Sequence, residues 1–200
     1  SREHQPARSG HEPSPRRSVD SDFPDEIACQ RIQGAQEYGG RIRVLLSMLL
    51  ESLFSMLTHH NVINGARVLD LFAGTGALGL EALSRGAREV VFIENGRVGQ
   101  KLITENIKKL RAEGATTLMR SDATALGGWI AAPFDLVFLD PPYGKGMGQT
   151  ALVKARAGGW LTPDAMIVCE ENAPLDPPQG FTREDKRKYG DTWITLLRQD

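Results

Sequence analysis

The stretch Val68-Leu69-Asp70-Leu71-Phe72-Ala73-Gly74-Thr75-Gly76-Ala77-Leu78-Gly79, continued by Leu80-Glu81-Ala82-Leu83-Ser84-Arg85-Gly86, decides the fold of this chain. Residues 66–72 are an apolar run typical of a strand that is buried on both faces. The glycine-rich residues 73–76 predict a tight turn, and residues 77–85 predict a helix that ends at Gly86. Together they predict the strand–turn–helix unit of an α/β sheet.

The same alternation continues toward the C-terminus. Apolar runs at residues 89–93, 116–119, 134–139 and 165–169 predict further strands, and residues 98–111 and 148–157 predict helices between them. Residues 181–188 and 192–197, joined at Gly190-Asp191, predict a terminal antiparallel hairpin. We therefore expect an α/β, Rossmann-like fold, with a mostly parallel seven-stranded sheet and helices on both faces.

The glycine turn also predicts a cofactor site. Gly74-Thr75-Gly76-Ala77-Leu78-Gly79 matches G-x-G-x-x-G, and here it follows a strand and opens a helix, the context in which the motif is meaningful. Glu94 ends the next strand about twenty residues later, where a carboxylate can accept both hydroxyls of a ribose. The pattern indicates an adenosine-containing cofactor, but by itself it does not separate NAD from S-adenosylmethionine.

Three acidic positions favour S-adenosylmethionine. Asp70 precedes the glycines, where it can accept from the amino group of a methionine part but would repel a diphosphate. Asp122, in Ser121-Asp122-Ala123, can reach an adenine amino group, although a helix N-cap is an equally good interpretation. The third is Asp140, discussed next. The candidate cofactor-binding residues are Asp70, Phe72, Ala73, Gly74, Thr75, Gly76, Glu94, Asn95, Asp122, Ala123 and Asp140.

Asp140-Pro141-Pro142-Tyr143 follows the strand at residues 134–139 and predicts the catalytic loop. Ligands of open α/β sheets bind at the carboxyl ends of the strands, and two prolines make the loop there stiff. The Asp140 carboxylate and the Pro141 carbonyl can accept the two N–H groups of an exocyclic amine, and Tyr143 offers a face for stacking on a base. Pro142 completes the candidate catalytic set, which has no role in hydride transfer. Methylation at pyrimidine carbon-5 would need a cysteine nucleophile after a proline, and no Pro-Cys pair occurs.

Composition narrows the class of protein. The chain has 200 residues, 40% of them apolar, and a formal net charge of −1. A basic footprint for nucleic acid must therefore be local, with Lys145, residues 186–188, Arg41 and Arg43 as candidates. Cys29 and Cys169 are far apart, which argues against a disulfide scaffold or a zinc site and indicates a reducing, cytoplasmic location. We predict no metal and no membrane span.

The N-terminal part differs in character from the rest. Residues 1–26 are rich in Ser, Pro and charged side chains and predict a disordered tail. Residues 27–60 predict an appendage, with a weak hairpin turning at Gly39-Gly40 and a helix over residues 45–59. The helix has a leucine-rich stripe that we expect to pack on the domain, with a partner-facing surface as the alternative. Residues 61–200 are the predicted catalytic domain.

These motifs resemble the RsmD family of bacterial methyltransferases. The resemblance is carried by residues 68–87, by Phe138-Leu139-Asp140-Pro141-Pro142-Tyr143 and by Arg187-Lys188-Tyr189-Gly190-Asp191-Thr192, and it covers residues 52–198. It implies an S-adenosylmethionine-dependent methyltransferase fold, and methylation of the exocyclic N2 of a guanine in 16S ribosomal RNA, free or in an assembling small subunit. Residues 44–50 depart from the family, with leucines and a methionine in place of its Pro-Thr turn and arginines.

Other functions remain open on sequence alone. The Asp-Pro-Pro-Tyr motif also occurs in DNA adenine and protein glutamine methyltransferases, although this chain has no room for a large target-recognition domain. An NAD-dependent oxidoreductase and a cofactor-binding module without activity are the remaining alternatives. Binding of S-adenosylmethionine against NAD separates the oxidoreductase from the methyltransferases.

Overall fold

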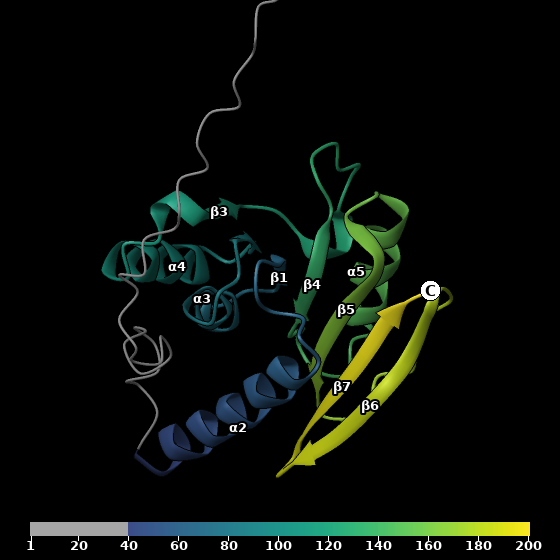
Figure 1. Cartoon of the computed structure of the whole chain (residues 1–200), viewed down its shortest axis with the longest axis horizontal. Coiled ribbons are helices and arrows are strands. Elements are labelled where there is room, and N and C mark those ends of the chain that lie inside the picture. Colours follow the sequence, from purple (N-terminus) through teal and green to yellow (C-terminus); the bar gives the residue numbers. More distant parts are fainter. Residues whose placement is uncertain (1–39) are drawn as a thin grey trace, which may run out of the picture.

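The computed structural model describes the backbone of residues 40–200 and the side chains of residues 48–200. The predicted tail at residues 1–26 and most of the predicted hairpin lie outside this range. The described chain forms three layers, with a central sheet between two sets of helices (Figure 1). No helix within the described range is long and apolar enough to cross a membrane.

Seven strands form one sheet in the order β3-β2-β1-β4-β5-β7-β6. The strands are β1 (Arg67–Leu71), β2 (Glu89–Ile93), β3 (Thr116–Met119), β4 (Phe134–Leu139), β5 (Leu161–Glu171), β6 (Phe181–Tyr189) and β7 (Thr192–Gln199). Strands β1 to β5 are parallel, whereas β7 runs antiparallel to both β5 and β6. The start of β7 therefore lies at the edge where the parallel strands end, which is the ligand-binding edge of such sheets.

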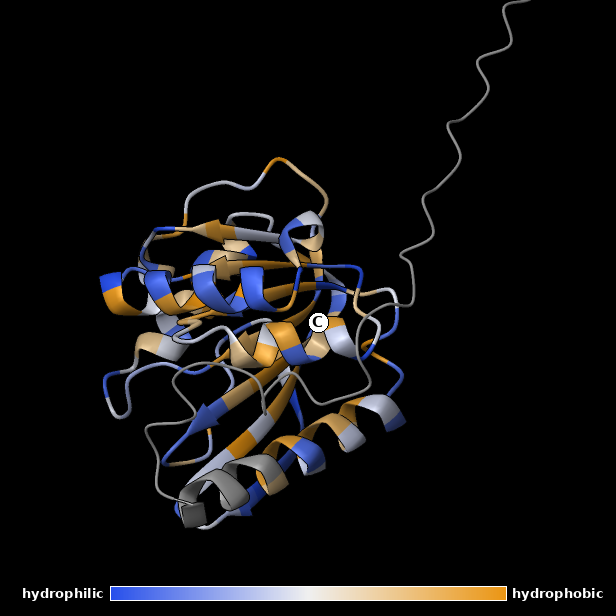
Figure 2. Ribbon diagram, turned by 90° about the vertical axis from the view of Figure 1, so that its left-hand side faces the viewer, coloured by the Kyte–Doolittle hydropathy of each residue, from blue (hydrophilic) through white to orange (hydrophobic). Residues whose placement is uncertain are grey.

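The helices cover both faces of the sheet (Figure 2). They are α2 (Gly40–His59), α3 (Ala77–Ser84), α4 (Arg97–Lys109) and α5 (Met147–Ala157), with short 3-10 turns η2 (Glu113–Ala115) and η3 (Ala123–Ala125). One apolar core joins α2, α3 and α4 to the sheet, and a second joins α5 and η3 to its other face. The predicted fold class and strand set are confirmed.

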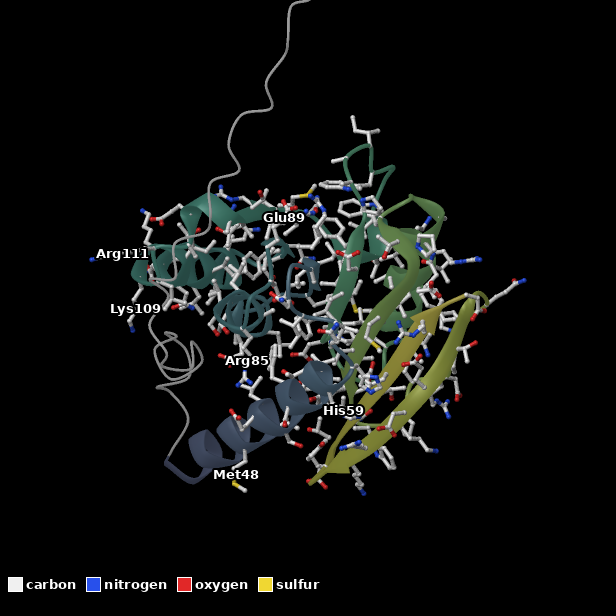
Figure 3. The ribbon with its side chains drawn as sticks, viewed as in Figure 1. Met48, His59, Arg85, Glu89, Lys109 and Arg111 are labelled. Atoms are coloured by element: carbon white, nitrogen blue, oxygen red, sulfur yellow. The ribbon has the colours of Figure 1, made fainter. Side chains whose placement is uncertain are left out.

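Helix α2 packs on the domain, as its leucine stripe predicts. Phe54 and Leu57 are fully buried in the first core, and Arg85, which follows α3 as its C-cap, donates to Glu51 over 3.0 Å. The Arg85 guanidinium also lies 5.0 Å from the centre of the Phe54 ring. Figure 3 shows Arg85 between α3 and α2, while Met48 points away from the sheet. Burial of each such large apolar side chain contributes about 1.5–3 kcal/mol to stability.

Two boundaries differ from the predictions. Helix α2 begins at Gly40, so residues 40–44, which were predicted as weakly strand-like, are helical. The apolar periodicity explains this, because Ile42 precedes Leu46 by one helical turn and arginine favours helices. Strand β5 begins at Leu161 rather than at residue 165, and its pairing with β4 shifts register between Phe134 and Leu136. This irregularity hides the first residues of β5 from a period-two pattern.

Candidate active site

The glycine turn after β1 is built from left-handed backbone. Phe72, Gly74 and Gly76 have φ values of 59°, 56° and 77°. For glycine this conformation costs little, but for a bulky residue such as Phe72 it is an outlier of the kind that clusters at functional sites. The turn is closed by a hydrogen bond from the Gly76 amide to the Ala73 carbonyl, at 2.7 Å.

The third glycine of the motif lets α3 pack directly on the sheet. A Cβ on Gly79 would lie 2.5 Å from the Phe92 ring, 2.7 Å from Val90 and 3.0 Å from the Asp70 carboxylate. In addition, the Gly79 amide donates to Asp70 Oδ2 over 3.0 Å. Asp70 is 2% exposed, and this contact holds its carboxylate against the first turn of α3.

Glu94 braces the loop from the end of β2. Its two carboxylate oxygens accept from the amides of Gly74, at 2.8 Å, and Gly96, at 2.6 Å. A Cβ on Gly99 would lie 2.9 Å from both the Glu94 side chain and the Gly74 carbonyl, so the close approach needs a glycine in α4 as well. Asn95, the next candidate, is exposed.

Asn106 is a loop-supporting residue that the sequence reasoning missed. Its side chain is fully buried, and its amide donates to the Thr75 carbonyl over 3.0 Å. A polar residue between Ile103 and Ile107 on the buried face of α4 is the signal that could have revealed it, because buried amides are kept where they have partners.

Asp122 acts as an N-cap. Its Oδ1 accepts from the Thr124 amide, at 2.8 Å, and from the Thr124 hydroxyl, at 2.7 Å, which opens η3. These two bonds lower the pKa of Asp122. Of the two interpretations of this residue, the structure shows the cap. Ala123, which follows it, is buried in the second core.

The loop at residues 140–143 stands where β4 ends. The Asp140 amide donates to the Leu71 carbonyl over 3.4 Å, which places the loop beside the end of β1. Pro141 is buried, and a Cβ on Gly148 would lie 3.3 Å from its ring. Pro142 and Tyr143 are exposed, so a stiff, anchored segment presents a ring to solvent.

Tyr143 is held at its hydroxyl end. Its hydroxyl donates to Glu170 at 3.4 Å, and the Thr192 side chain lies near enough to lower the pKa of Tyr143. Burial and the Glu170 charge raise the pKa of Tyr143. Next along the loop, the Gly144 amide donates to Glu171 over 3.4 Å. The end of β5 and the start of β7 thus position the loop.

Carboxyl groups from four adjacent strands, β2, β1, β4 and β5, converge at this edge. Burial raises the pKa of Asp70 well above its ordinary value, and the charges of Asp140 and Glu94 raise it further against the opposing Gly79 hydrogen bond. Asp140 is exposed at the surface, but the protein atoms around it reduce its hydration and, together with the charges of Glu170 and Glu171, raise the pKa of Asp140 to about 7. Carboxyl groups that repel one another in this way favour a cationic ligand and disfavour an anionic one.

The structure therefore brings together the glycine turn, Asp70, Glu94 and Asp140, whereas Asp122 is committed through one oxygen to its cap. No cluster of three or more metal-ligating side chains occurs among the residues whose side chains are described. Cys169 is fully buried in the second core.

Comparison with known proteins identifies the family. The family described as conserved hypothetical protein 95 matches residues 38–198. Ribosomal RNA small subunit methyltransferase D from Escherichia coli K12 is 36% identical over 162 residues, or 80% of each chain. The protein of that name from Haemophilus influenzae is 33% identical over 163 residues, or 79% of this chain and 80% of its own.

Solved structures agree with the sequence comparison. A conserved hypothetical protein from Streptococcus pyogenes superposes with a TM-score of 0.64 at 35% identity, covering 74% of this chain and 94% of its own. Magnesium protoporphyrin IX methyltransferase from Synechocystis, solved with bound S-adenosylmethionine, shares the fold with a TM-score of 0.61 at 16% identity, covering 84% of this chain and 85% of its own. The chain therefore belongs to the conserved hypothetical protein 95 family of methyltransferases, the family that the RsmD-like motifs predict.

Proposed function

We propose that the protein transfers a methyl group from S-adenosylmethionine to the exocyclic N2 of a guanine in 16S ribosomal RNA, free or in an assembling small subunit. The observation that carries the proposal is the convergence of Asp70, Glu94 and Asp140 beside the glycine turn. This acidic edge fits the sulfonium and ammonium groups of S-adenosylmethionine and opposes the diphosphate of NAD. The ribosomal substrate is supported by the names of the relatives.

We assign the cofactor to the glycine turn and to the strand ends beside it. Glu94 would accept the ribose hydroxyls, exchanging one or both of the amides that it now holds, and Asp70 would lie toward the methionine amino group. The residues of the turn, from Phe72 to Gly76, would line the methionine part, while Asn95, Asp122 and Ala123 would border the adenosine. When bound, S-adenosylmethionine supplies a methyl group on a positively charged sulfur.

Asp140 and Pro141 would prepare the accepting nitrogen. The lone pair of an aromatic amino group is delocalised into the ring, and acceptors on its two N–H groups help it to localise toward the methyl carbon. Tyr143 would stack on the base, which must be unpaired or turned out of its helix. Methyl transfer would leave the accepting nitrogen positively charged and the donor sulfur neutral, and one amino proton would then leave through Asp140 to solvent.

The state of Asp140 suits this role. Its raised pKa in the free protein means that the protonated form of Asp140 persists to higher pH than that of an ordinary aspartate. A cationic donor beside the carboxylate lowers that pKa, so binding of the cofactor favours the ionised form that accepts N–H groups. Asp140 therefore loses one proton when the cofactor binds, before methyl transfer. The proton that leaves the methylated nitrogen is a different one and departs after the transfer.

Methyl transfer to RNA tests the proposal. Unmethylated small subunits and naked 16S ribosomal RNA are incubated with methyl-labelled S-adenosylmethionine, and the digested RNA is analysed for N2-methylguanosine. Asp140→Ala should abolish transfer and leave cofactor binding measurable by calorimetry. Label in adenine, in DNA or in protein glutamine would instead favour the alternative substrates, and binding of NAD without S-adenosylmethionine would overturn the proposal. As a ribosomal enzyme, the protein would act in the cytoplasm.

A further inference from the structure

We propose that Lys186, Lys188 and Trp193, on the terminal hairpin, form a phosphate clamp that holds the RNA backbone beside the catalytic loop. This inference names a substrate-binding surface and rests on the proposed RNA substrate. The two ammonium groups would contact phosphates, and Trp193 would act as a positioning residue that fixes where they stand.

The two lysines share one aromatic ring. Lys186 Nζ lies 6.0 Å from the centre of the Trp193 ring, and Lys188 Nζ lies 5.8 Å from it. The negative face of an indole attracts each cation, whereas two ammonium groups gathered around one ring repel each other. A bridging anion, or two successive phosphates of one strand, would relieve that repulsion.

The strand geometry explains why both lysines reach the same ring. Lys186 pairs with Thr195, and Lys188 pairs with Trp193, in the antiparallel ladder of β6 and β7. Residues two apart on a strand lie on the same face, about 6.6 Å apart along it. This separation is comparable to the spacing of successive phosphates on an extended strand. Arg187, between them, points to the opposite face and pairs with Asp185 over 2.9 Å.

The lysines are available to a ligand. Both are exposed on β6, which is the edge strand of the sheet. Within the described part of the chain, neither forms an ion pair with a carboxylate. No described carboxylate neutralises their charge, which contrasts with Arg183, Arg187 and Arg198 on the same hairpin, each paired with an acid.

The phosphate clamp lies close to the catalytic loop. Trp193 pairs with Glu171 on β5, and Glu171 accepts from the Gly144 amide directly after Tyr143. Lys188, Trp193 and Glu171 are thus neighbours across three strands, a span of about 10 Å between the outer two. A strand held at the lysines can place a nucleotide a step or two away over Tyr143.

A second basic surface provides a matched control. Arg97, Lys101, Lys108 and Arg120 line an open groove of about 390 Å³ along α4, together with Glu105. It borders β3, at the opposite edge of the sheet from β6. Lys101 there lies 3.8 Å from Glu105. Removing two lysines from this groove removes the same charge as removing the clamp.

Direct RNA binding is the first readout. Filter binding of 16S ribosomal RNA and small subunits is measured against salt for the wild type, Lys186→Gln/Lys188→Gln and Lys101→Gln/Lys108→Gln. The plot of the logarithm of the RNA-binding constant against the logarithm of salt concentration has a negative slope. Loss of two phosphate contacts should make that slope shallower by about 1.4 and weaken binding about twentyfold near 0.1 M salt. The α4 variant should bind like the wild type, and calorimetry should give the same affinity for S-adenosylmethionine in all three proteins.

Trp193 is tested by its two replacements. Trp193→Leu removes the ring face and should weaken RNA binding about fivefold, whereas Trp193→Phe keeps a ring and should restore most of the affinity. Thermal melting of each variant identifies loss of fold, and the lysine variants carry the test if Trp193→Leu unfolds.

Four outcomes test the phosphate clamp and separate it from the proposed reaction. The clamp is overturned if its lysine variant binds RNA like the wild type, if the α4 variant loses as much affinity, or if the wild-type protein binds no RNA. A protein that needs Lys186 and Lys188 to bind RNA but does not methylate it would support the clamp and refute the proposed reaction.

Discussion

The Ser52 hydroxyl lies 2.9 Å from the Tyr189 hydroxyl, and this hydrogen bond joins residues 137 positions apart in the sequence. It ties helix α2 to the end of β6, directly before the turn that leads to Thr192 and Trp193. Because the Tyr143 hydroxyl bonds to Glu170, which pairs with Ile194 of β7, helix α2 and the catalytic loop are both attached near this end of the hairpin.

Tyr189→Phe should lower the free energy of unfolding by about 1 kcal/mol, the usual contribution of a partly buried neutral hydrogen bond. Ser52→Ala should cost a similar amount. Urea unfolding of both single variants and the double variant gives the coupling energy. Additive losses in the double variant would show that the two hydroxyls do not interact.

Gly79→Ala should destabilise the fold by about 1–3 kcal/mol, because the new methyl group would clash with the side chains of Phe92 and Val90. Gly114→Ala is the control, since a Cβ there meets nothing within 4 Å. Thermal unfolding compares the two. Equal melting temperatures would contradict the tight packing of α3 on β2.

Asn106→Ala should destabilise the protein by about 1–3 kcal/mol and weaken binding of S-adenosylmethionine, because the Thr75 carbonyl loses its donor. The exposed Asn64 offers a control substitution, Asn64→Ala. Calorimetric titration of the folded variants separates the two effects. An unchanged cofactor affinity would mean that Asn106 supports only the fold.

Much of the fold and part of the candidate site were predictable from the sequence. The strand set, the glycine turn and the loop at Asp140 were predictable because apolar runs and glycine or proline turns are local signals. The positions of Glu94 and Asp140 followed from the rule that parallel strands end at one edge. The predicted start of α2, at residue 45, was wrong because the glycine pair Gly39-Gly40 resembled a turn.

Other features depend on contacts between distant segments. The Asn106 bond to Thr75 and the Ser52 bond to Tyr189 join elements whose relative placement no local pattern specifies. The left-handed Phe72 is likewise set by its surroundings, since its residue type disfavours that conformation. An aspartate at position 122 is expected both for an N-cap and for an adenine contact. The sequence therefore does not distinguish the two roles, and the hydrogen bond to the Thr124 amide that shows the cap is seen only in the structure.

The reaction should depend on pH through Asp140. The carboxylate must be ionised to accept N–H groups, and its pKa near 7 means that ionisation increases through neutral pH. We therefore expect kcat/KM for S-adenosylmethionine, which reports the free enzyme, to rise with pH, pass its midpoint near 7 and level above it. Methyl transfer to 16S ribosomal RNA between about pH 5 and 9 provides the measurement.

Glu170→Gln should move that rising limb to lower pH. The Glu170 charge is the first electrostatic cause, after burial, of the raised pKa of Asp140, so its removal makes ionisation easier. Glutamine keeps an oxygen for the Tyr143 hydroxyl, which separates the charge effect from the loss of loop support. Glu113→Gln, on the exposed η2 turn, should leave the profile in place. A profile that stays fixed in Glu170→Gln, or that moves equally in both variants, would show that the limb does not report Asp140, and the ionising group would then have to be sought outside this acidic edge.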